Sequence, residues 1–509
     1  MSNNRQISKN IVYSLISFGI NIIISFFFTP YLLDSVGKEA YSFFPLVNNI
    51  IGYTSIFTSA IGSMAGRFVT IAYYKGDFDK ARGYFNSVLA GYIFLSLVFS
   101  LVGFAFVFYI TDLINVPLYL KHDVQWLFSF SIISMFITMS TTSYSLGTYV
   151  KNRPDLASIR DAISNIVRIS CIILLFYFFM PSIIYMSASA VCAAFIIAGF
   201  NIFYKRRLLP EIEINIHRYF SRSSIIEVVS AGIWSSLNAL SCLLSGSINL
   251  LLTNILFSAT QTANYSIAQS IPNLITTVSA MIAITFTPHF NILYAKDEMK
   301  ELVYEIQKSI KILSFILAIP IGFFLVNSDI LLQLWVPNAY NETILLLSII
   351  IIFFTSFGAI TNPLFGIFTI TNKRKAPSFA LLIVGIMNIL SMFLLLKYSE
   401  LGIYAIAISG CTFIFIRDLF FTPMYGAYCL GLKKTIFYPI FFKGVIAIIV
   451  VVLCSIFFRL FIQEVTFMNF IILFTITTSI SLLVNSLILM TKSERSYFFT
   501  LVKSKLLKH

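Results

Sequence analysis

Three polar side chains that could bind an anion share one face of the apolar segment 158–179. Asp161, Asn165 and Arg168 stand at i, i+4 and i+7, so they form one row along a helix. An ionisable group near the middle of a membrane-crossing helix is costly and by default marks a functional site. We expect Arg168 to bind either Asp161 or an anionic substrate. If the helix begins later than predicted, Arg168 instead extends its side chain to the membrane interface.

Further polar rows lie in two apolar segments that are far apart in the chain. Segment 10–33 carries Asn21 and Ser25 in a row of serines, and segment 225–252 carries Asn238, Ser245 and Asn249. The two rows match at an offset of 224 residues. Small polar residues let membrane helices pack closely, and they also line water-filled cavities. Because the rows are repeated, we favour the cavity.

The next segments along the chain add polar positions of the same kind, and the full set of predicted cavity residues follows. Segment 40–66 contributes Asn48, and segment 262–288 contributes Gln269 and Asn273. The predicted substrate-binding residues are therefore Arg168, Asp161, Asn165, Asn21, Ser25, Asn48, Asn238, Ser245, Asn249, Gln269 and Asn273. Arg67 and His289, at the ends of two segments, are candidates for guiding an anionic headgroup; a role in loop positioning is the alternative.

Membrane helices must position these side chains. Of the 509 residues, 58% are hydrophobic and only 11% are charged. This is too little polar surface to cover the hydrophobic core of a soluble protein of this length. The sequence predicts an all-α integral membrane protein with about 14 transmembrane helices of roughly 20 residues or more. The predicted spans are 10–33, 40–66, 84–110, 124–148, 158–179, 182–204, 225–252, 262–288, 307–326, 343–370, 377–396, 402–425, 440–461 and 468–490.

Basic residues fall almost entirely on one side of this predicted topology. Of the 35 Lys and Arg residues, all but Lys38, Lys121, Lys397 and Arg459 lie in, or towards, the chain ends and alternate connections, on the side of the N-terminus. The positive-inside rule then places both termini in the cytoplasm. The same pattern explains the net charge of +14 by topology and contact with anionic headgroups, so we expect no nucleic-acid partner.

The first six spans resemble the next six at offsets of 221 to 224 residues. For example, Lys151–Pro154 pairs with Arg374–Pro377, and Tyr73–Lys75 with Tyr294–Lys296. Six is an even number, so the two halves are parallel and related by an axis along the membrane normal. The predicted domains are a six-helix bundle (1–204), a cytoplasmic linker (205–224), a second six-helix bundle (225–425), and two extra helices with a basic tail (426–509).

Several classes of protein are disfavoured by what the sequence lacks. There is no Gly-rich phosphate loop, no His/Cys/Glu cluster with metal spacing and no long extramembrane segment with paired carboxylates. We therefore expect no cofactor, no metal and no enzymatic activity. No carboxylate lies near the middle of span 10–33 or span 225–252, which argues against ion coupling through a buried acid there.

At the level of whole architecture the chain resembles a known family. Six plus six plus two spans, the opening Asn10–Leu15, the stretches Gly66–Val69 and Tyr74–Asp77, and the loop Lys151–Pro154 are similar to the polysaccharide-transporter (Wzx-type O-antigen and capsule flippase) family of the multidrug/oligosaccharidyl-lipid/polysaccharide exporter superfamily. The resemblance implies two bundles, alternating access, and a bacterial inner-membrane flippase of undecaprenyl-diphosphate-linked oligosaccharides. It also implies membrane lipids and other polysaccharide-assembly proteins as partners.

Two alternatives remain at this point. One is a multidrug or small-solute antiporter of related two-bundle architecture, whose family typically has twelve spans and often an acidic residue in the first. The other is a membrane glycan polymerase or ligase, which would need a large external loop. An arginine suits a diphosphate because guanidinium pairs well with phosphate oxygens. The sequence thus favours the flippase.

Overall fold

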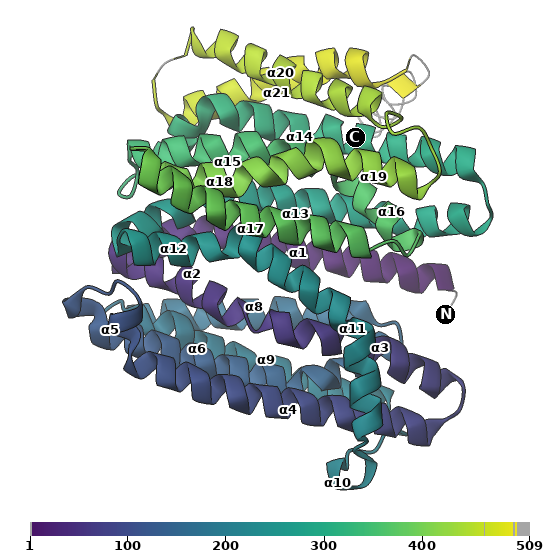
Figure 1. Cartoon of the computed structure of the whole chain (residues 1–509). Helices are drawn as coiled ribbons and strands as arrows, with labels where there is room; N and C mark the ends of the chain where they lie inside the picture. The colour runs from purple at the N-terminus through teal and green to yellow at the C-terminus, as the bar shows by residue number, and fades with distance from the viewer. Residues whose placement is uncertain (1–2, 463, 492–493, 496–509) are drawn as a thin grey trace, which may run out of the picture. The chain divides into compact units, whose positions relative to one another are not determined.

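The computed structural model of the chain is built of helices, with no strand in the part of the chain that it describes (Figure 1). It describes the backbone of residues 3–462, 464–491 and 494–495, and the side chains of these residues apart from 3–12, 14–18, 21 and 25. Contacts divide the chain into two compact units, residues 1–243 with 247–263, and residues 244–246 with 264–509. Each unit is a bundle of long helices.

The first unit contains the helices from the N-terminus to the middle of the chain. They are α1 (Asn3–Val36), α2 (Lys38–Gly52), α3 (Ser55–Tyr74), α4 (Phe78–Phe108), α5 (Ile110–Leu113), η1 (Leu118–Leu120), α6 (Lys121–Thr141), η2 (Thr142–Ser145), α7 (Leu146–Val150), α8 (Pro154–Phe178), α9 (Ile184–Leu208), α10 (Ile216–Tyr219), α11 (Arg222–Cys242) and α12 (Ile248–Leu256). A π-helical turn, η3 (Leu243–Ser247), joins α11 to α12.

The second unit contains the remaining helices. They are α13 (Ala259–Ala295), α14 (Met299–Trp335), α15 (Glu342–Thr361), η4 (Asn362–Leu364), α16 (Phe365–Ile370), α17 (Lys375–Tyr398), α18 (Ile403–Ile416), the π-helical turn η5 (Arg417–Phe421), α19 (Thr422–Cys429), α20 (Tyr438–Arg459) and α21 (Phe467–Leu489).

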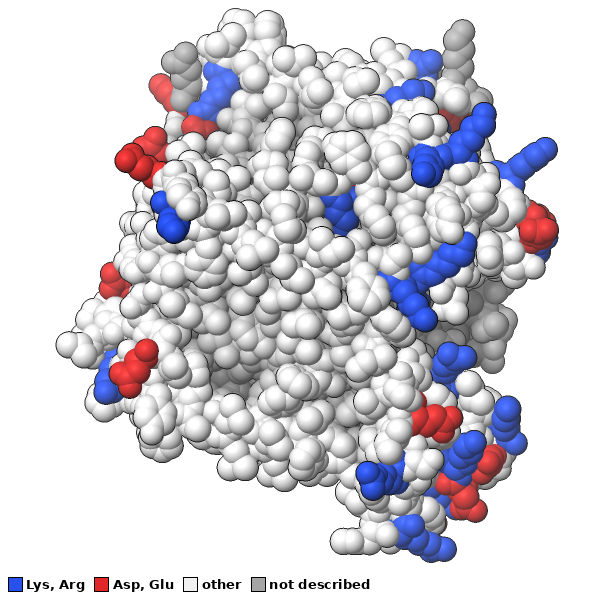
Figure 2. Space-filling model, in the orientation of Figure 1, with Lys and Arg blue, Asp and Glu red and all other residues white. Residues whose placement is uncertain are grey.

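The predicted all-α membrane architecture is confirmed. Twelve helical stretches of the described residues are long and apolar enough to cross a membrane, and each coincides with a predicted span. The other two predicted spans correspond to α1, with a shorter apolar stretch at Ile22–Val36, and to the pair α2 and α3. On the face seen in Figure 2, basic side chains of each unit gather mainly at one end of its helices, here called the basic end.

The predicted span 40–66 is not one continuous helix. It is interrupted at Tyr53 and Thr54, whose N–H groups donate to the carbonyls of Ile50 and Ile51 in a tight turn. The hydroxyl of Thr54 donates to the same Ile51 carbonyl, at 2.7 Å. A side chain that competes for backbone partners in this way favours the end of a helix. Pro45 inside α2, by contrast, is accommodated without a break.

The two halves of the predicted repeat share unusual turns. Asn152 and Asn372 both have positive φ, 51° and 53°, and each is the second residue after the end of its helix, α7 or α16. In both turns an N–H one residue later donates back to the fifth preceding carbonyl, from Arg153 to Thr148 and from Lys373 to Phe368. The shared turn places Asn152 and Asn372 at like positions, 220 residues apart. The predicted pairing of Lys151–Pro154 with Arg374–Pro377, at an offset of 223, differs from this by three residues and remains a prediction.

The connection between α9 and α11 is hydrogen-bonded to α4 along its length. Asn86 donates to the Glu213 carbonyl and accepts from the N–H of Asn215, both at 2.9 Å. Ser87 and Ser221 exchange a second pair of bonds, at 3.1 and 2.9 Å. These reciprocal bonds fix where α11 begins and hold its start against the first unit.

Helix α11 then packs closely on α3. A Cβ atom at Gly232 would lie 1.9 Å from the carbonyl oxygen of Ala60, so only glycine allows this approach. For this reason the contacts place α11 and α12 in the first unit, although they open the second half of the predicted repeat. The division into 1–204, 205–224, 225–425 and 426–509 follows the repeat and remains a prediction.

Candidate functional site

A cavity of about 440 Å³ lies inside the first unit, between α1, α2 and α8. Its wall combines polar and apolar side chains, and Arg168 is the one charged residue among those that line it. The other lining residues are Ile24, Phe28, Thr29, Leu32, Tyr41, Phe44, Pro45, Asn48, Asn49, Asn165, Ile169 and Ile172. The predicted residues Arg168, Asn165 and Asn48 are therefore brought together.

Arg168 carries an unused hydrogen-bond donor in this cavity. Its Nε is buried and has no hydrogen-bond partner in the described part of the chain. The guanidinium carbon lies 5.2 Å from the centre of the Phe44 ring, close enough for a cation–π contact. A buried donor without a partner costs about 1–3 kcal/mol.

Asp161 does not provide the partner that the sequence offered for Arg168. Its carboxylate bonds the adjacent Arg160, with Nη2 and Oδ1 2.7 Å apart. Arg160 also donates to the side-chain oxygen of Asn201 on α9. Asp161 is not among the residues that line the cavity. The structure therefore does not pair Asp161 with Arg168, and an anionic substrate as its partner stays a prediction.

Neutral polar groups line the cavity beside the arginine. Asn48 is exposed, while Asn49 and Asn165 are half-buried. Amides of this kind both donate and accept hydrogen bonds, as sugar hydroxyls require. Sequence reasoning missed Asn49 and Phe44, because they lie one residue away from the row of Tyr41, Pro45 and Asn48 and were not expected on the same wall.

A second cavity, of about 360 Å³, lies further along α2 in the same unit. It is almost entirely apolar: Tyr53 and Thr54 are the polar exceptions among residues such as Phe57, Phe99 and Phe128. Helix α2 lines both cavities, with Asn48 and Asn49 on the cationic one and Ile50 and Ile51 on the apolar one. The unit thus offers cationic and apolar binding surfaces within one stretch of helix.

The remaining candidates lie elsewhere in the structure. The side chains of Asn21 and Ser25 lie outside the described residues. Ser245 and Asn249 are buried, 5% and 2% exposed, whereas Asn238 is exposed. On α13, Gln269 is half-buried and Asn273 is exposed. Arg67 on α3 and His289 on α13 are both exposed. None of these described side chains lines the cavity around Arg168.

The second unit also holds an arginine within a helix, and that arginine is paired. Arg417 and Asp418 begin the π-helical turn η5. Their side chains form an ion pair, with Nη2 and Oδ1 2.6 Å apart. The hydroxyl of Thr422 donates to the same carboxylate oxygen at 3.3 Å. The charge of Arg417 is therefore compensated by a residue of its own helix.

No cluster of three or more His, Cys, Asp or Glu side chains that could hold a metal ion occurs among the described residues.

No family model matches the chain. A curated protein, the "Uncharacterized membrane protein EpsK" of Bacillus subtilis (strain 168), is 27% identical over 437 residues, which are 86% of this chain and 85% of that protein.

Two solved structures are similar in fold. An outward-facing multidrug resistance MATE family transporter of the MOP superfamily matches with a TM-score of 0.65 at 11% identity. The match covers 84% of this chain and 95% of the transporter's chain. The lipid II flippase MurJ, in an inward closed conformation, matches with a TM-score of 0.62 at 14% identity. The match covers 95% of this chain and 98% of the MurJ chain. The chain therefore has the helical fold of these transporters, as predicted.

Proposed function

We propose that this protein is a flippase of the MOP superfamily that moves a lipid-linked oligosaccharide with a diphosphate group across the membrane. The observation that carries the proposal is Arg168, whose Nε has no partner among the described residues, in a polar cavity beside an apolar one. A diphosphate-linked lipid has an anionic group, sugar hydroxyls and a hydrocarbon chain. The two cavities supply a matching surface for each part.

The likeness to the lipid II flippase MurJ supports the same conclusion, since that likeness extends over 95% of this chain. Arg168 would pair with the phosphate oxygens, which guanidinium binds in a bidentate manner. Asn48 and Asn165 would bond sugar hydroxyls. Alternating access between the two bundles would then expose the site to each side of the membrane in turn.

The finer assignment follows the resemblance stated from the sequence. We propose a Wzx-type transporter of undecaprenyl-diphosphate-linked repeat units for O-antigen or capsule assembly, in the bacterial inner membrane. The one-sided basic residues put both termini in the cytoplasm. Other polysaccharide-assembly proteins would supply and collect the lipid-linked unit.

A multidrug antiporter for organic cations is not favoured. The 440 Å³ cavity has a cation and no carboxylate in its wall, so it would repel a cationic drug. The matched transporters and flippases also argue against a polymerase or ligase.

The proposal is tested by transport in proteoliposomes that contain the purified protein. A fluorescent undecaprenyl-diphosphate-linked oligosaccharide in the vesicles should become accessible to a membrane-impermeant quencher faster than in protein-free vesicles. The same lipid with a neutral linkage in place of the diphosphate should move much more slowly. Equal rates for both lipids would overturn the proposed role of the anionic group.

A further inference from the structure

A separate basic pocket lies in the second unit, at the basic ends of α14, α20 and α21. This cavity, of about 290 Å³, is lined by three lysines, Lys308, Lys311 and Lys443. Its apolar wall includes Ile440 in the first turn of α20 and Ile488 and Leu489 at the end of α21. A cluster of lysines above aliphatic side chains is the arrangement found where a membrane lipid meets water.

The charges around this pocket leave one lysine in excess. Lys308 pairs with Glu305 and Lys311 with Glu494, each with Nζ and Oε1 2.7 Å apart. Lys443 is exposed and makes no ion pair with any residue that the structure describes. Two carboxylates therefore face three ammonium groups, and the pocket attracts one further negative charge.

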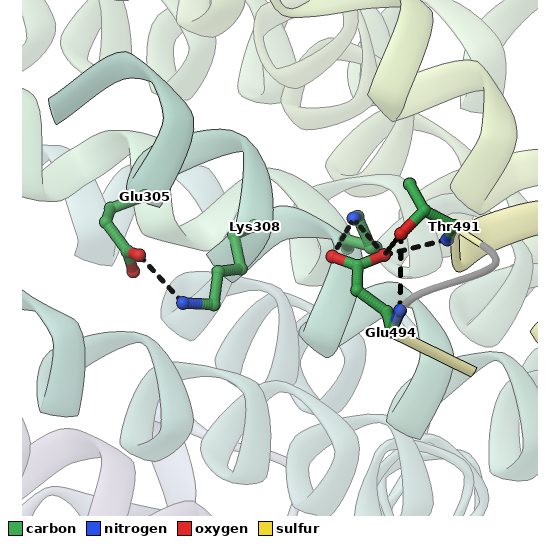
Figure 3. A network of polar contacts seen from close by, with 5 residues as sticks. Glu305, Lys308, Thr491 and Glu494 are labelled. Carbon is green, nitrogen blue, oxygen red and sulfur yellow. Dashed lines mark hydrogen bonds and ion pairs between the residues drawn. The ribbon is translucent and has the colours of Figure 1, made fainter. Parts of the chain in front are cut away.

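Glu494 is held in place at the pocket by more than its ion pair. Its carboxylate accepts bonds from the N–H of Thr491 at 2.8 Å and from the hydroxyl of Thr491 at 3.1 Å. The N–H of Glu494 in turn donates to the Thr491 hydroxyl, at 3.4 Å. Figure 3 shows this reciprocal arrangement, a capping box, beside the Glu305–Lys308 pair. A fixed carboxylate at this place competes with any other anion for Lys311.

We propose that this pocket binds the phosphate of an anionic membrane phospholipid such as phosphatidylglycerol. The phosphodiester would lie against Lys443 and Lys311, and the glycerol and the first acyl carbons would contact Ile440 and Ile488. Basic pockets between helices at a membrane interface bind such headgroups. The site is separate from the cavity around Arg168 and does not depend on the proposed transport function.

The test uses the purified full-length protein in a neutral detergent. Native mass spectrometry would count bound lipids as phosphatidylglycerol is titrated in, with phosphatidylcholine and inorganic phosphate as parallel titrants. A saturable phosphatidylglycerol complex that the other two do not form supports the site. Equal binding of phosphatidylcholine, or a complex with inorganic phosphate of the same affinity, overturns the assignment to an anionic lipid.

Two variants with opposite expected effects locate the site. Lys443→Gln should weaken phosphatidylglycerol binding about fivefold, the effect of one basic residue at a membrane surface. Glu494→Gln removes the competing charge and should strengthen binding by a similar factor, while glutamine keeps the capping-box acceptor. The control, Lys434→Gln, changes an exposed lysine that does not line the pocket and should have no effect.

Either of two results contradicts the proposal. One is that Lys443→Gln and Lys434→Gln bind the lipid equally well. The other is that Glu494→Gln binds it no more tightly than the unchanged protein, and this second result is decisive even if Lys443→Gln does not fold.

Discussion

Arg168 in the first unit and Arg417 in the second are chemically alike and are treated differently by their surroundings. Each guanidinium lies over a phenylalanine ring, at 5.2 Å from Phe44 and 5.4 Å from Phe365. Arg417 bonds the carboxylate of Asp418, which is 2% exposed. Arg168 has an unsatisfied Nε and faces a cavity. Arg417 is bonded within its own helix, whereas the Nε of Arg168 has no partner among the residues that the structure describes.

The position of the acidic residue explains why Arg417 is paired with Asp418 while Arg168 is not paired with Asp161. Asp418 follows Arg417 directly, and the π-helical turn η5 brings the two side chains together. On α8, the carboxylate of Asp161 is seven residues from Arg168 and is occupied by Arg160. An acidic residue on the same helix face as an arginine therefore does not by itself form an ion pair with it, because a nearer cation can bind the carboxylate.

The largest expected effect on stability is at the paired arginine. Asp418→Asn keeps the shape of the side chain but leaves the Arg417 charge uncompensated. We expect the free energy of unfolding in mild detergent to fall by about 3 kcal/mol, as when one member of a buried ion pair is removed. Thermal denaturation measures the change. In the control, Asp79→Asn removes an exposed pair with Arg82 and should cost less than about 1 kcal/mol.

A similar loss for both variants would mean that the Arg417–Asp418 pair is no more important to the fold than a surface contact, and the contrast with Arg168 would disappear.

The largest expected effect on transport is at the unpaired arginine. Arg168→Gln should reduce flipping of the diphosphate-linked lipid in proteoliposomes at least tenfold, on the order of 1.4 kcal/mol or more. Its melting temperature should stay the same or rise, since a buried donor without a partner is removed. Arg207→Gln, at an exposed position on α9, is the matched control. A large fall in melting temperature would assign Arg168 to the fold instead.

A smaller effect is expected when Arg168 is given a partner. Asn165→Asp places a carboxylate three residues before it, on the same wall of the cavity. Residues three apart are neighbours on a helix, so the new charge competes with an anionic substrate. We expect transport to fall about fivefold, equivalent to roughly 1 kcal/mol. Transport at the original rate would show that the arginine does not bind the moving anion.

The smallest effects should separate two asparagines that the sequence predicted to line the cavity. Asn48 faces the cavity, so Asn48→Ala should slow transport about threefold without lowering the melting temperature. Asn249 is 2% exposed, so Asn249→Ala should cost about 1 kcal/mol of stability and change transport less than about twofold. If the two variants behave alike in both assays, the two asparagines do not differ in role.

The helices and Arg168 could be predicted from the sequence because both depend on local pattern. Hydropathy places long helices without knowledge of their neighbours, and a spacing of i, i+4 and i+7 puts Asp161, Asn165 and Arg168 on one face. The break at Thr54 could not be predicted, since its hydroxyl competes for a carbonyl in a way that hydropathy does not register.

Tertiary contacts account for the other differences. That α11 belongs with the first unit depends on the Gly232 contact with Ala60 and on the hydrogen bonds from Asn86, none of which leaves a periodic pattern. In the same way, the matching rows of α1 and of α11–α12 have described members, Ser245 and Asn249, that are buried.

The most direct test of the central claim is the affinity of the purified protein for a soluble isoprenoid diphosphate, measured calorimetrically for the unchanged protein, Arg168→Gln and Arg207→Gln. We expect Arg168→Gln to bind at least tenfold more weakly at an unchanged melting temperature, and Arg207→Gln to bind normally. If Arg168→Gln binds the diphosphate as tightly as the unchanged protein, Arg168 is not the anion-binding group and the account is contradicted.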